Sequence, residues 1–340
     1  MRRIALACAA SLVLYIVGFA CLLDRPLTLG ALRARIDANL ARGAAIQGPK
    51  LIILAGSNGP YSHRCETIEP MIGRPCVNAG VAVGIGLDYL FARWEPLLHP
   101  GDIVYLPLEE AQYSRPRSTA YLGPDATIML RHDRTTLWAM PWQREIAALF
   151  AANLRGAIMS LIETALADDG FHDPRSAARG GYNVWGDHTG HTAALAAGNQ
   201  ASLASIVPFH PTAGQIRDGY GTVLVTGFLR WADSHGVRAI GGIPTGFADS
   251  PIGADSLAAI AAIYRGNGAA FLDLANRGRY PRAAFFDTQD HLNETAQIIH
   301  SAAVAKALVQ LTGHTVTGHT VMGHTVMGHT VMGPIPAPSP

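Results

Sequence analysis

The sequence predicts an α/β protein organised as a three-layer, doubly wound parallel sheet. Short apolar runs bounded by Gly, Pro or Asn alternate with segments of helical periodicity, and the connections between them are short. Wholly apolar runs of this length are typical of parallel strands that are buried on both faces. The predicted strands cover residues 51–54, 75–79, 102–107, 237–244 and 270–274, and the predicted helices cover 63–72, 84–98, 214–234, 255–267 and 294–311.

The N-terminus carries an uncharged apolar segment. After Arg2 and Arg3, residues 4–23 contain no charged side chain, which is long enough to cross a bilayer as a helix. No small-x-small cleavage site follows, so we expect an uncleaved transmembrane anchor over residues 1–25, with a cleaved signal peptide as the alternative. An Ala- and Arg-rich helical connector over residues 26–50 would follow.

The rest of the chain divides into a core and two less regular parts. We expect the α/β domain to span residues 51–312, with residues 114–210 forming a helical and irregular insertion or cap. Residues 313–340 contain tandem Gly-His-Thr-Val units and a Pro-rich end, which predicts a disordered tail. The histidines of these repeats either bind a transition metal or have no assigned role: His314, His319, His324 and His329.

Charge and cysteine content restrict the location and the partners. The formal net charge is +1, which gives no electrostatic case for nucleic-acid binding. Two cysteines, Cys65 and Cys76, lie outside the expected anchor. In an oxidising compartment they would form a disulfide, and the alternative is a pair of buried thiols. With the anchor, this favours a single-pass inner-membrane protein whose main domain faces the periplasm.

Two chemically important residues lie at predicted element ends on the same edge of the sheet. Ser57 follows the strand at 51–54 within the sequence GSNG, and His291 lies just before the last helix. Carboxyl ends of parallel strands meet at one edge, where α/β proteins bind ligands. A histidine there could remove the serine proton, and a nearby carboxylate, Asp287 or Asp290, could orient its ring.

These residues resemble the SGNH/GDSL hydrolase superfamily. The similarity rests on Gly56, Ser57 and Asn58 after an apolar strand, on the sequence VNAG at 77–80 and on DTQDHLN at 287–293. It is closest to a membrane-anchored bacterial branch associated with O-acylation of cellulose-like or alginate-like exopolysaccharide. It implies an SGNH or flavodoxin-like fold over about residues 50–115 and 237–311 and leaves the middle unmatched.

The resemblance also implies roles for individual residues. Ser57 would be the nucleophile, His291 the general base and then acid, and Asp287 the orienting carboxylate, with Asp290 as the alternate. The backbone N–H groups of Ser57 and Gly80 would form the oxyanion hole. The family usually adds an asparagine after the third strand, but this chain has LPLEEAQY at 106–113. The residues that could substitute for it are Asn183, Asn58 and Asn78.

Further polar residues have both structural and functional interpretations. Glu109 and Glu110 would be solvated or salt-bridged, or would contact substrate. Three residues of a Gly-rich loop, Tyr182, Trp185 and Asp187, could bind a sugar together with Asn58, or could simply pack the loop. His188 and His191 have a metal-like spacing, but no cysteine or acidic cluster completes a site, so we expect no metal and no cofactor.

The sequence therefore predicts a serine esterase or O-acyltransferase acting on a cell-surface polysaccharide, with a membrane acyltransferase or polysaccharide synthase as the expected partner. Hydrolysis and transfer would use the same residues, so the triad does not distinguish them. An inactive SGNH-like module that binds polysaccharide or acts as a scaffold is the main alternative. A purely structural subunit of a synthase ranks below it.

Overall fold

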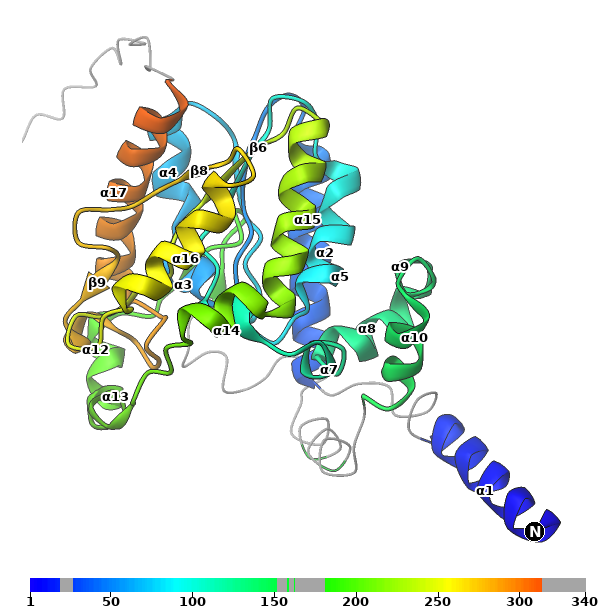
Figure 1. The fold of residues 1–340 in the computed structure, drawn as a ribbon. Helices are drawn as coiled ribbons and strands as arrows, with labels where there is room; N and C mark the ends of the chain where they lie inside the picture. Colours follow the sequence, from blue (N-terminus) through cyan, green and yellow to red (C-terminus); the bar gives the residue numbers. More distant parts are fainter. Residues whose placement is uncertain (19–26, 152–157, 159–161, 163–180, 314–340) are drawn as a thin grey trace, which may run out of the picture.

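The computed structural model describes residues 1–18, 27–151, 158, 162 and 181–313. Its centre is a five-stranded sheet in the order β2-β1-β3-β6-β8, in which every neighbouring pair is parallel (Figure 1). The predicted α/β class with a parallel sheet is thus confirmed. The strands are β1 (Leu51–Ile53), β2 (Cys76–Asn78), β3 (Ile103–Leu106), β6 (Arg238–Gly241) and β8 (Ala270–Phe271).

Successive side chains of a strand enter different cores on the two faces of the sheet. Leu51 and Ile53 pack with one set of helices, and Ile52 packs with the other. All three side chains are fully buried, which explains why β1 reads as an unbroken apolar run. One face is covered by α4 (Cys65–Ile72) and α17 (Glu294–Thr312), and the other by α2 (Leu27–Ala45), α5 (Leu87–Trp94), α15 (Tyr220–Ser234) and α16 (Ala254–Arg265).

The segment expected as a connector contributes to one of these layers. Ile36 and Leu40 of α2 are buried in the same core as Ile52, and Gly43 lies directly against the ring of Trp94. The other helices and strands are short: α1 (Arg2–Tyr15), α3 (Asn58–Ser62), η2 (Glu95–Leu97), α6 (Glu110–Ser114), α7 (Arg117–Ala120), α8 (Pro124–His132), α9 (Arg134–Trp138), α10 (Trp142–Leu149), β4 (Gly181–Tyr182), β5 (His188–Thr189), α12 (Ala193–Ala196), η3 (Ala197–Asn199), α13 (Gln200–Ser205), α14 (Ala213–Asp218), β7 (Gly246–Phe247), β9 (Arg279–Tyr280) and η4 (Arg282–Ala284).

The order of the strands reverses at β1. The chain passes from β1 outward to β2, returns to β3 on the other side of β1, and continues to β6 and β8. This is the flavodoxin-like order, in which the crevice for a ligand opens between the carboxyl ends of β1 and the next strand on its other side. Ser57 follows β1 and Glu109 follows β3, so these two residues flank that crevice.

Several predicted helices differ from the observed ones. The predicted helix 214–234 is divided at Gly219 into α14 and α15, because the chain there lies directly against the backbone of α6. A Cβ atom on Gly221 would lie 1.7 Å from the carbonyl oxygen of Gln112. In the predicted insertion, α9 ends at Trp138 and α10 covers residues 142–149. Helical spacing also covers residues 138–166 in the sequence, and most of this segment after residue 151 lies outside the described residues.

The two ends of the chain are described only in part. No helix among the described residues is both long and apolar enough to cross a membrane. The apolar segment 4–23 contains α1 and continues into residues 19–26, which the structure does not describe. The repeat tail from His314 onward, with its other three histidines, likewise lies outside the described residues.

Candidate active site

Ser57 occupies the sharp turn between β1 and α3. It is the residue before the first turn of α3, in a right-handed helical conformation with φ −66° and ψ −21°. Gly80, which follows β2, packs against this turn, and a Cβ atom on Gly80 would lie 2.8 Å from Gly59 Cα. Only glycine allows the two backbones to approach so closely. The sequences GSNG and VNAG are therefore neighbours at the carboxyl edge of the sheet.

His291 and Asp287 form a hydrogen-bonded pair in the loop before α17. His291 Nδ1 lies 2.6 Å from Asp287 Oδ1. The loop is closed by an antiparallel bridge between Phe285 and Leu292 and by the bond from Phe286 N to the His291 carbonyl (2.8 Å). A carboxylate on Nδ1 fixes the tautomer in which Nε2 accepts a proton. The carboxylate that contacts the His291 ring is thus Asp287, four residues before the histidine.

The helix after Ser57 holds the histidine loop. The ring of Tyr61 stacks on that of His291, with ring centroids 4.0 Å apart and planes at 11°. Ser62 Oγ donates to the carbonyl of Asp290 (2.7 Å) and accepts from Leu292 N (3.5 Å). Tyr61 lies one helical turn after Ser57, so one short helix connects the serine with the histidine. Within the described residues, Ser57 and His291 are not hydrogen-bonded to each other.

The hydroxyl of Ser57 instead contacts Glu109. Glu109 Oε1 accepts from Ser57 Oγ and from Asn58 N, each at 3.4 Å, which is a long distance for a hydrogen bond. The side chain is buried, and no ion pair to it exists among the described residues. Burial raises the pKa of Glu109, and the opposing charges of His291 and Arg115 do not offset this rise.

Asp290, the alternate orienting residue, has different neighbours. Its pKa is raised well above the ordinary value by burial and by the carboxylates of Glu109 and Glu110, against the charge of Arg279. It forms no hydrogen bond with the His291 ring in the described part of the chain. The choice of Asp290 as the orienting residue is therefore wrong, because its side chain faces other acids while Asp287 reaches Nδ1.

Glu110 belongs to a separate ion-pair network. Its Oε2 lies 2.8 Å from His210 Nδ1, and His210 Nε2 lies 3.1 Å from Ser250 Oγ. Both Glu109 and Glu110 are 7% exposed, so a solvated strand end is wrong for each, whereas the alternative of a salt-bridge partner fits the contact of Glu110 with His210. The burial of Glu109 and Glu110 was not predicted from the sequence, because the segments that cover them lie far away in the chain.

All three candidate asparagines are committed to structural hydrogen bonds, beginning with Asn183 and Asn58. Asn183 Oδ1 accepts from Trp185 N and Asp187 N, both at 3.0 Å, and so holds its own loop. Asn58 Nδ2 donates to the carbonyl of Pro107 (2.7 Å), which links β1 to β3. The expected oxyanion role of Asn183 and the substrate role of Asn58 are therefore not supported by their contacts.

Asn78 holds the backbone around the serine turn. Its Nδ2 donates to the carbonyls of Gly59 (3.0 Å) and His63 (2.9 Å), and its Oδ1 accepts from Gly80 N at 3.4 Å. The last bond is long, which leaves the Gly80 N–H weakly bound next to Ser57. That the backbone N–H groups of Gly80 and Ser57 bind an oxyanion stays a prediction.

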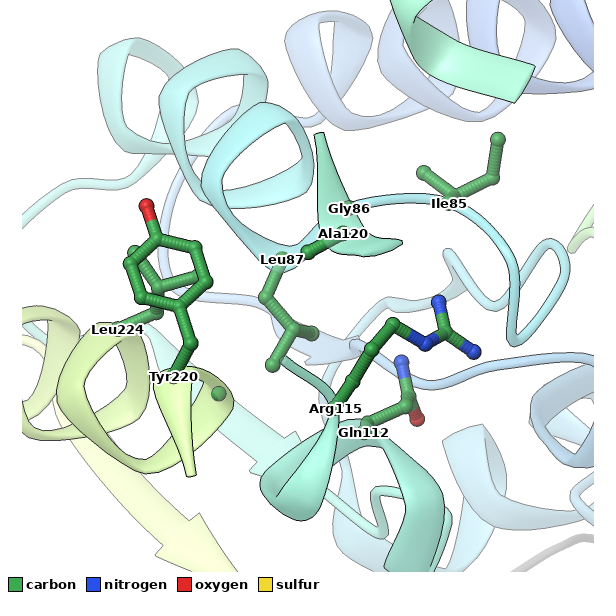
Figure 2. Close-up of a pocket in the computed structure, with 9 residues that line it drawn as sticks. Ile85, Gly86, Leu87, Gln112, Arg115, Ala120, Tyr220 and Leu224 are labelled. Atoms are coloured by element: carbon green, nitrogen blue, oxygen red, sulfur yellow. The ribbon is translucent and has the colours of Figure 1, made fainter. Parts of the chain in front are cut away.

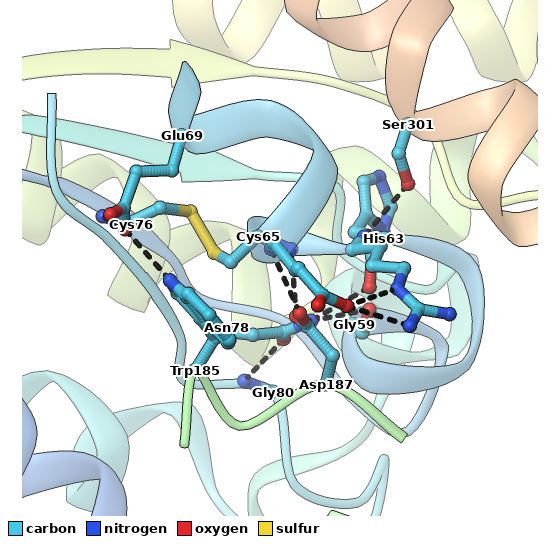
Figure 3. Close-up of a disulfide and its surroundings, with 12 residues drawn as sticks. Gly59, His63, Cys65, Glu69, Cys76, Asn78, Gly80, Trp185, Asp187 and Ser301 are labelled. Carbon is cyan, nitrogen blue, oxygen red and sulfur yellow. Dashed lines mark hydrogen bonds and ion pairs between the residues drawn. A yellow bond between two sulfur atoms is a disulfide. The ribbon is translucent and has the colours of Figure 1, made fainter. Parts of the chain in front are cut away.

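The disulfide between Cys65 and Cys76 ties α4 to β2 beside this turn (Figure 3). Asp187, from the Gly-rich loop, accepts from Cys65 N (2.8 Å) and from Asn78 Nδ2 (3.0 Å). Trp185 donates from Nε1 to Glu69 (2.8 Å), and its carbonyl accepts from Asn78 N (2.8 Å). Asp187 is fully buried, so these two residues dock the loop on the disulfide and do not face a substrate.

Removal of this disulfide is expected to destabilise the domain. The two cysteines are 11 positions apart, and the chain-entropy model gives roughly 3 kcal/mol for a loop of this size. We expect the double variant Cys65→Ser/Cys76→Ser to lose about that much free energy of unfolding in urea titrations. A reducing agent should lower the stability of the native chain and leave the double variant unchanged. Equal sensitivity of both proteins to reduction would contradict this prediction.

Tyr182 is the most exposed of the three loop residues expected to bind a sugar, at 51%. One face of its ring is covered by the guanidinium of Arg35, whose Cζ lies 3.7 Å from the ring centroid. His188 meets its edge, with ring centroids 4.9 Å apart. A stacked arginine occupies one face of the ring, so packing in the loop accounts for that face.

His188 and His191 belong to an aromatic cluster around Tyr61. His188 stacks on the other side of the Tyr61 ring from His291, with ring centroids 4.1 Å apart. The Nδ1 atoms of His188 and His191 are 3.1 Å apart. Burial lowers the pKa of His188 to about 2 and that of His191 to about 4, so both rings are neutral at pH 7. No group of three or more His, Cys, Asp or Glu side chains suited to a metal ion occurs in the part of the chain that is described.

A small pocket lies between α5, α6 and α15 (Figure 2). Arg115, Gln112 and Tyr220 line it together with apolar residues of α5 and α15. Gln112 Oε1 accepts from Glu109 N (2.9 Å), so this lining residue caps the start of α6. None of the residues expected from the sequence to act chemically lines it.

Two residues at this site, Tyr61 and Ser62, were not assigned by sequence reasoning, and Glu109 was considered only as a solvated, salt-bridged or substrate-contacting residue. Tyr61 and Ser62 could have been found from their position one helical turn after Ser57. The position of Glu109, directly after the strand that pairs with β1, is the sequence feature that could have pointed to it. Comparison with protein-family models, with curated proteins and with solved structures finds no match to this chain.

Proposed function

We propose that the protein is a membrane-attached serine esterase or O-acyltransferase that acts on a cell-surface polysaccharide in the periplasm. The observation that carries the proposal is the Asp287–His291 pair, whose ring stacks on Tyr61 one helical turn after Ser57. A histidine oriented by a carboxylate next to a serine at the crevice of the sheet is the arrangement that activates a hydroxyl.

The reaction would proceed in two steps. Ser57 Oγ attacks the carbonyl carbon of an ester while His291 Nε2 takes the hydroxyl proton. The C–O bond to the leaving alcohol then breaks, and His291 returns the proton to that alcohol, leaving an acyl group on Ser57. In the second step water or a sugar hydroxyl attacks the acyl carbon and gives its proton to His291. Ser57 regains the proton, and the product is an acid or a new ester.

Glu109 would complete the oxyanion hole. The carboxyl group lies 3.4 Å from Ser57 Oγ, close enough to reach an oxyanion formed beside that oxygen. An ionised carboxylate would repel the oxyanion, whereas the neutral acid, whose formation burial favours by raising the pKa of Glu109, would donate a hydrogen bond to it. In its neutral form Glu109 would take the place of the asparagine that the SGNH pattern supplies.

The location follows from two further features. A disulfide in the domain fits an oxidising compartment such as the periplasm. The uncharged segment 4–23 would attach the chain to the inner membrane. Attachment places the domain where exopolysaccharide emerges, and the resemblance to SGNH proteins supports such a polymer as the acyl acceptor or donor. Its partner would be a membrane acyltransferase or a polysaccharide synthase.

The test separates hydrolysis from transfer. The full chain is incubated with a chromogenic acetate ester, alone and with cello-oligosaccharides or mannuronate oligosaccharides. Release of chromophore without sugar acetylation identifies an esterase, and acetylated oligosaccharide in the mass spectrum identifies a transferase. The proposal is refuted if neither product exceeds the level that the Ser57→Ala variant forms.

The second candidate is an inactive SGNH-like module that binds polysaccharide or acts as a scaffold. The contact of Ser57 with Glu109 instead of His291 favours it. This candidate predicts that polymer output in cells depends on the protein but is unchanged by Ser57→Ala. The acyl-transfer proposal predicts loss of polymer acylation with the same substitution.

A further inference from the structure

Helix α10 buries a charged side chain and exposes large apolar ones. Its inner face holds Arg144, which is fully buried and paired with Asp125 and Asp88. Its outer face holds Trp142 and Ile146, which are 64% and 48% exposed. Helices on the surface of a soluble protein normally bury the apolar stripe and expose the charges. The outer face of α10 is therefore suited to an apolar neighbour.

Adjacent residues extend this apolar surface. Trp138, at the end of α9, is 70% exposed, and Phe150, just after α10, is 48% exposed. We call Trp138, Trp142, Ile146 and Phe150 the α9–α10 face. Contiguous exposed apolar residues on this scale mark an interaction surface, whereas single ones are ordinary.

The α9–α10 face is continuous with helix α1. The rings of Phe150 and Tyr15 stack with centroids 5.8 Å apart. No residue of α1 is buried, and its large apolar side chains, such as Ile4 (69%) and Leu14 (71%), are exposed. Figure 1 shows α1 projecting from the domain next to α10. A helix whose apolar side chains are exposed all round is typical of a lipid environment.

We propose that the α9–α10 face lies on a lipid bilayer, beside α1, and so fixes the orientation of the domain on the membrane. Tryptophan is enriched at the boundary between headgroups and acyl chains, because its ring is apolar and its N–H is polar. Arg134, exposed one turn before Trp138, would meet anionic headgroups. This inference rests on the proposed membrane attachment and is independent of the serine chemistry.

The test uses the full chain in vesicles of phosphatidylcholine and phosphatidylglycerol. In a background of Cys8→Ser and Cys21→Ser, single cysteines are introduced and labelled with bimane: Ile146→Cys and Trp142→Cys on the α9–α10 face, Leu12→Cys on α1, and Val223→Cys as the control. Val223 is 59% exposed on α15. Acyl-chain bromolipids report contact with the bilayer, and aqueous iodide reports contact with water.

We expect bromolipids to quench the labels at residues 142 and 146 about as strongly as the label at 12, with no quenching at 223. Quenching at residue 12 alone would overturn the inference and leave membrane attachment intact. Labels at 142 and 146 that are shielded from both quenchers would show that protein covers the face, either a second copy or another part of this chain. Absence of bromolipid quenching at all four positions would refute the attachment as well.

Discussion

Ser57→Ala is expected to lower kcat/KM for a chromogenic acetate ester by about 10³-fold or more, because the hydroxyl is the attacking group. His291→Ala should cost a similar factor, since it removes the only proposed base. The double variant should be no slower than either single variant by more than a few-fold, because the two groups act as a unit. Initial rates of chromophore release from the purified full chain measure all three.

A matched substitution controls for nonspecific effects. Ser205 is exposed, and its hydroxyl donates to the carbonyl of Ser202, so Ser205→Ala is expected to leave the rate unchanged. Asp287→Asn should lower the rate by roughly 10²–10⁴-fold, since it disturbs the tautomer of His291 while keeping the shape of the site. Wild-type rates in Ser57→Ala would remove the acyl-enzyme mechanism, whatever the other variants show.

Glu109→Ala is expected to lower kcat by about 10²–10³-fold, the usual cost of removing one oxyanion donor. Glu109→Gln keeps a donor of the same length and should stay within about tenfold of wild type in kcat. The two variants share the loss of the carboxyl group and differ in hydrogen bonding, so their ratio isolates the donor. Equal rates in both would contradict the proposed role.

The pH dependence gives a second readout. Burial raises the pKa of Glu109 above its ordinary value, so wild-type activity should fall as the pH rises through that raised pKa and the acid ionises. Glu109→Gln should lack this loss. Because the folded protein holds this proton more tightly than the unfolded chain, wild-type stability should also fall relative to Glu109→Gln as pH rises. Parallel pH profiles, or a Gln variant faster than wild type at every pH, would identify Glu109 as a spectator or an inhibitor.

The strands and the last helix could be predicted from the sequence because their signals are local. Each strand of the buried parallel sheet reads as an apolar run, and β1 is the clearest case. Helix α17 begins where Asn293 caps it by accepting from Ala296 N (3.1 Å). The pairing of Asp287 with His291 was accessible because the two residues lie four positions apart in one loop.

Other features depend on contacts between distant segments, which periodicity does not reveal. Glu109 reads as a solvated strand end, yet it is buried against the turn at Ser57. For Asp187 and Trp185 the sequence left sugar binding and loop packing open, and the structure docks both residues against Cys65 and Asn78. The exposure of the outer face of α10 could not be predicted either, because its apolar residues match the pattern of an ordinary packed helix.

The central claim is that the Ser57 hydroxyl and the His291 ring act on one reacting atom. A crystal structure of the full chain after reaction with an organophosphonate tests it most directly. The account predicts phosphorus bonded to Ser57 Oγ, with His291 Nε2 within about 3.2 Å of that oxygen or of the phosphonyl group. Phosphorus on another residue, or a His291 ring whose Nε2 points away from the adduct, would contradict it.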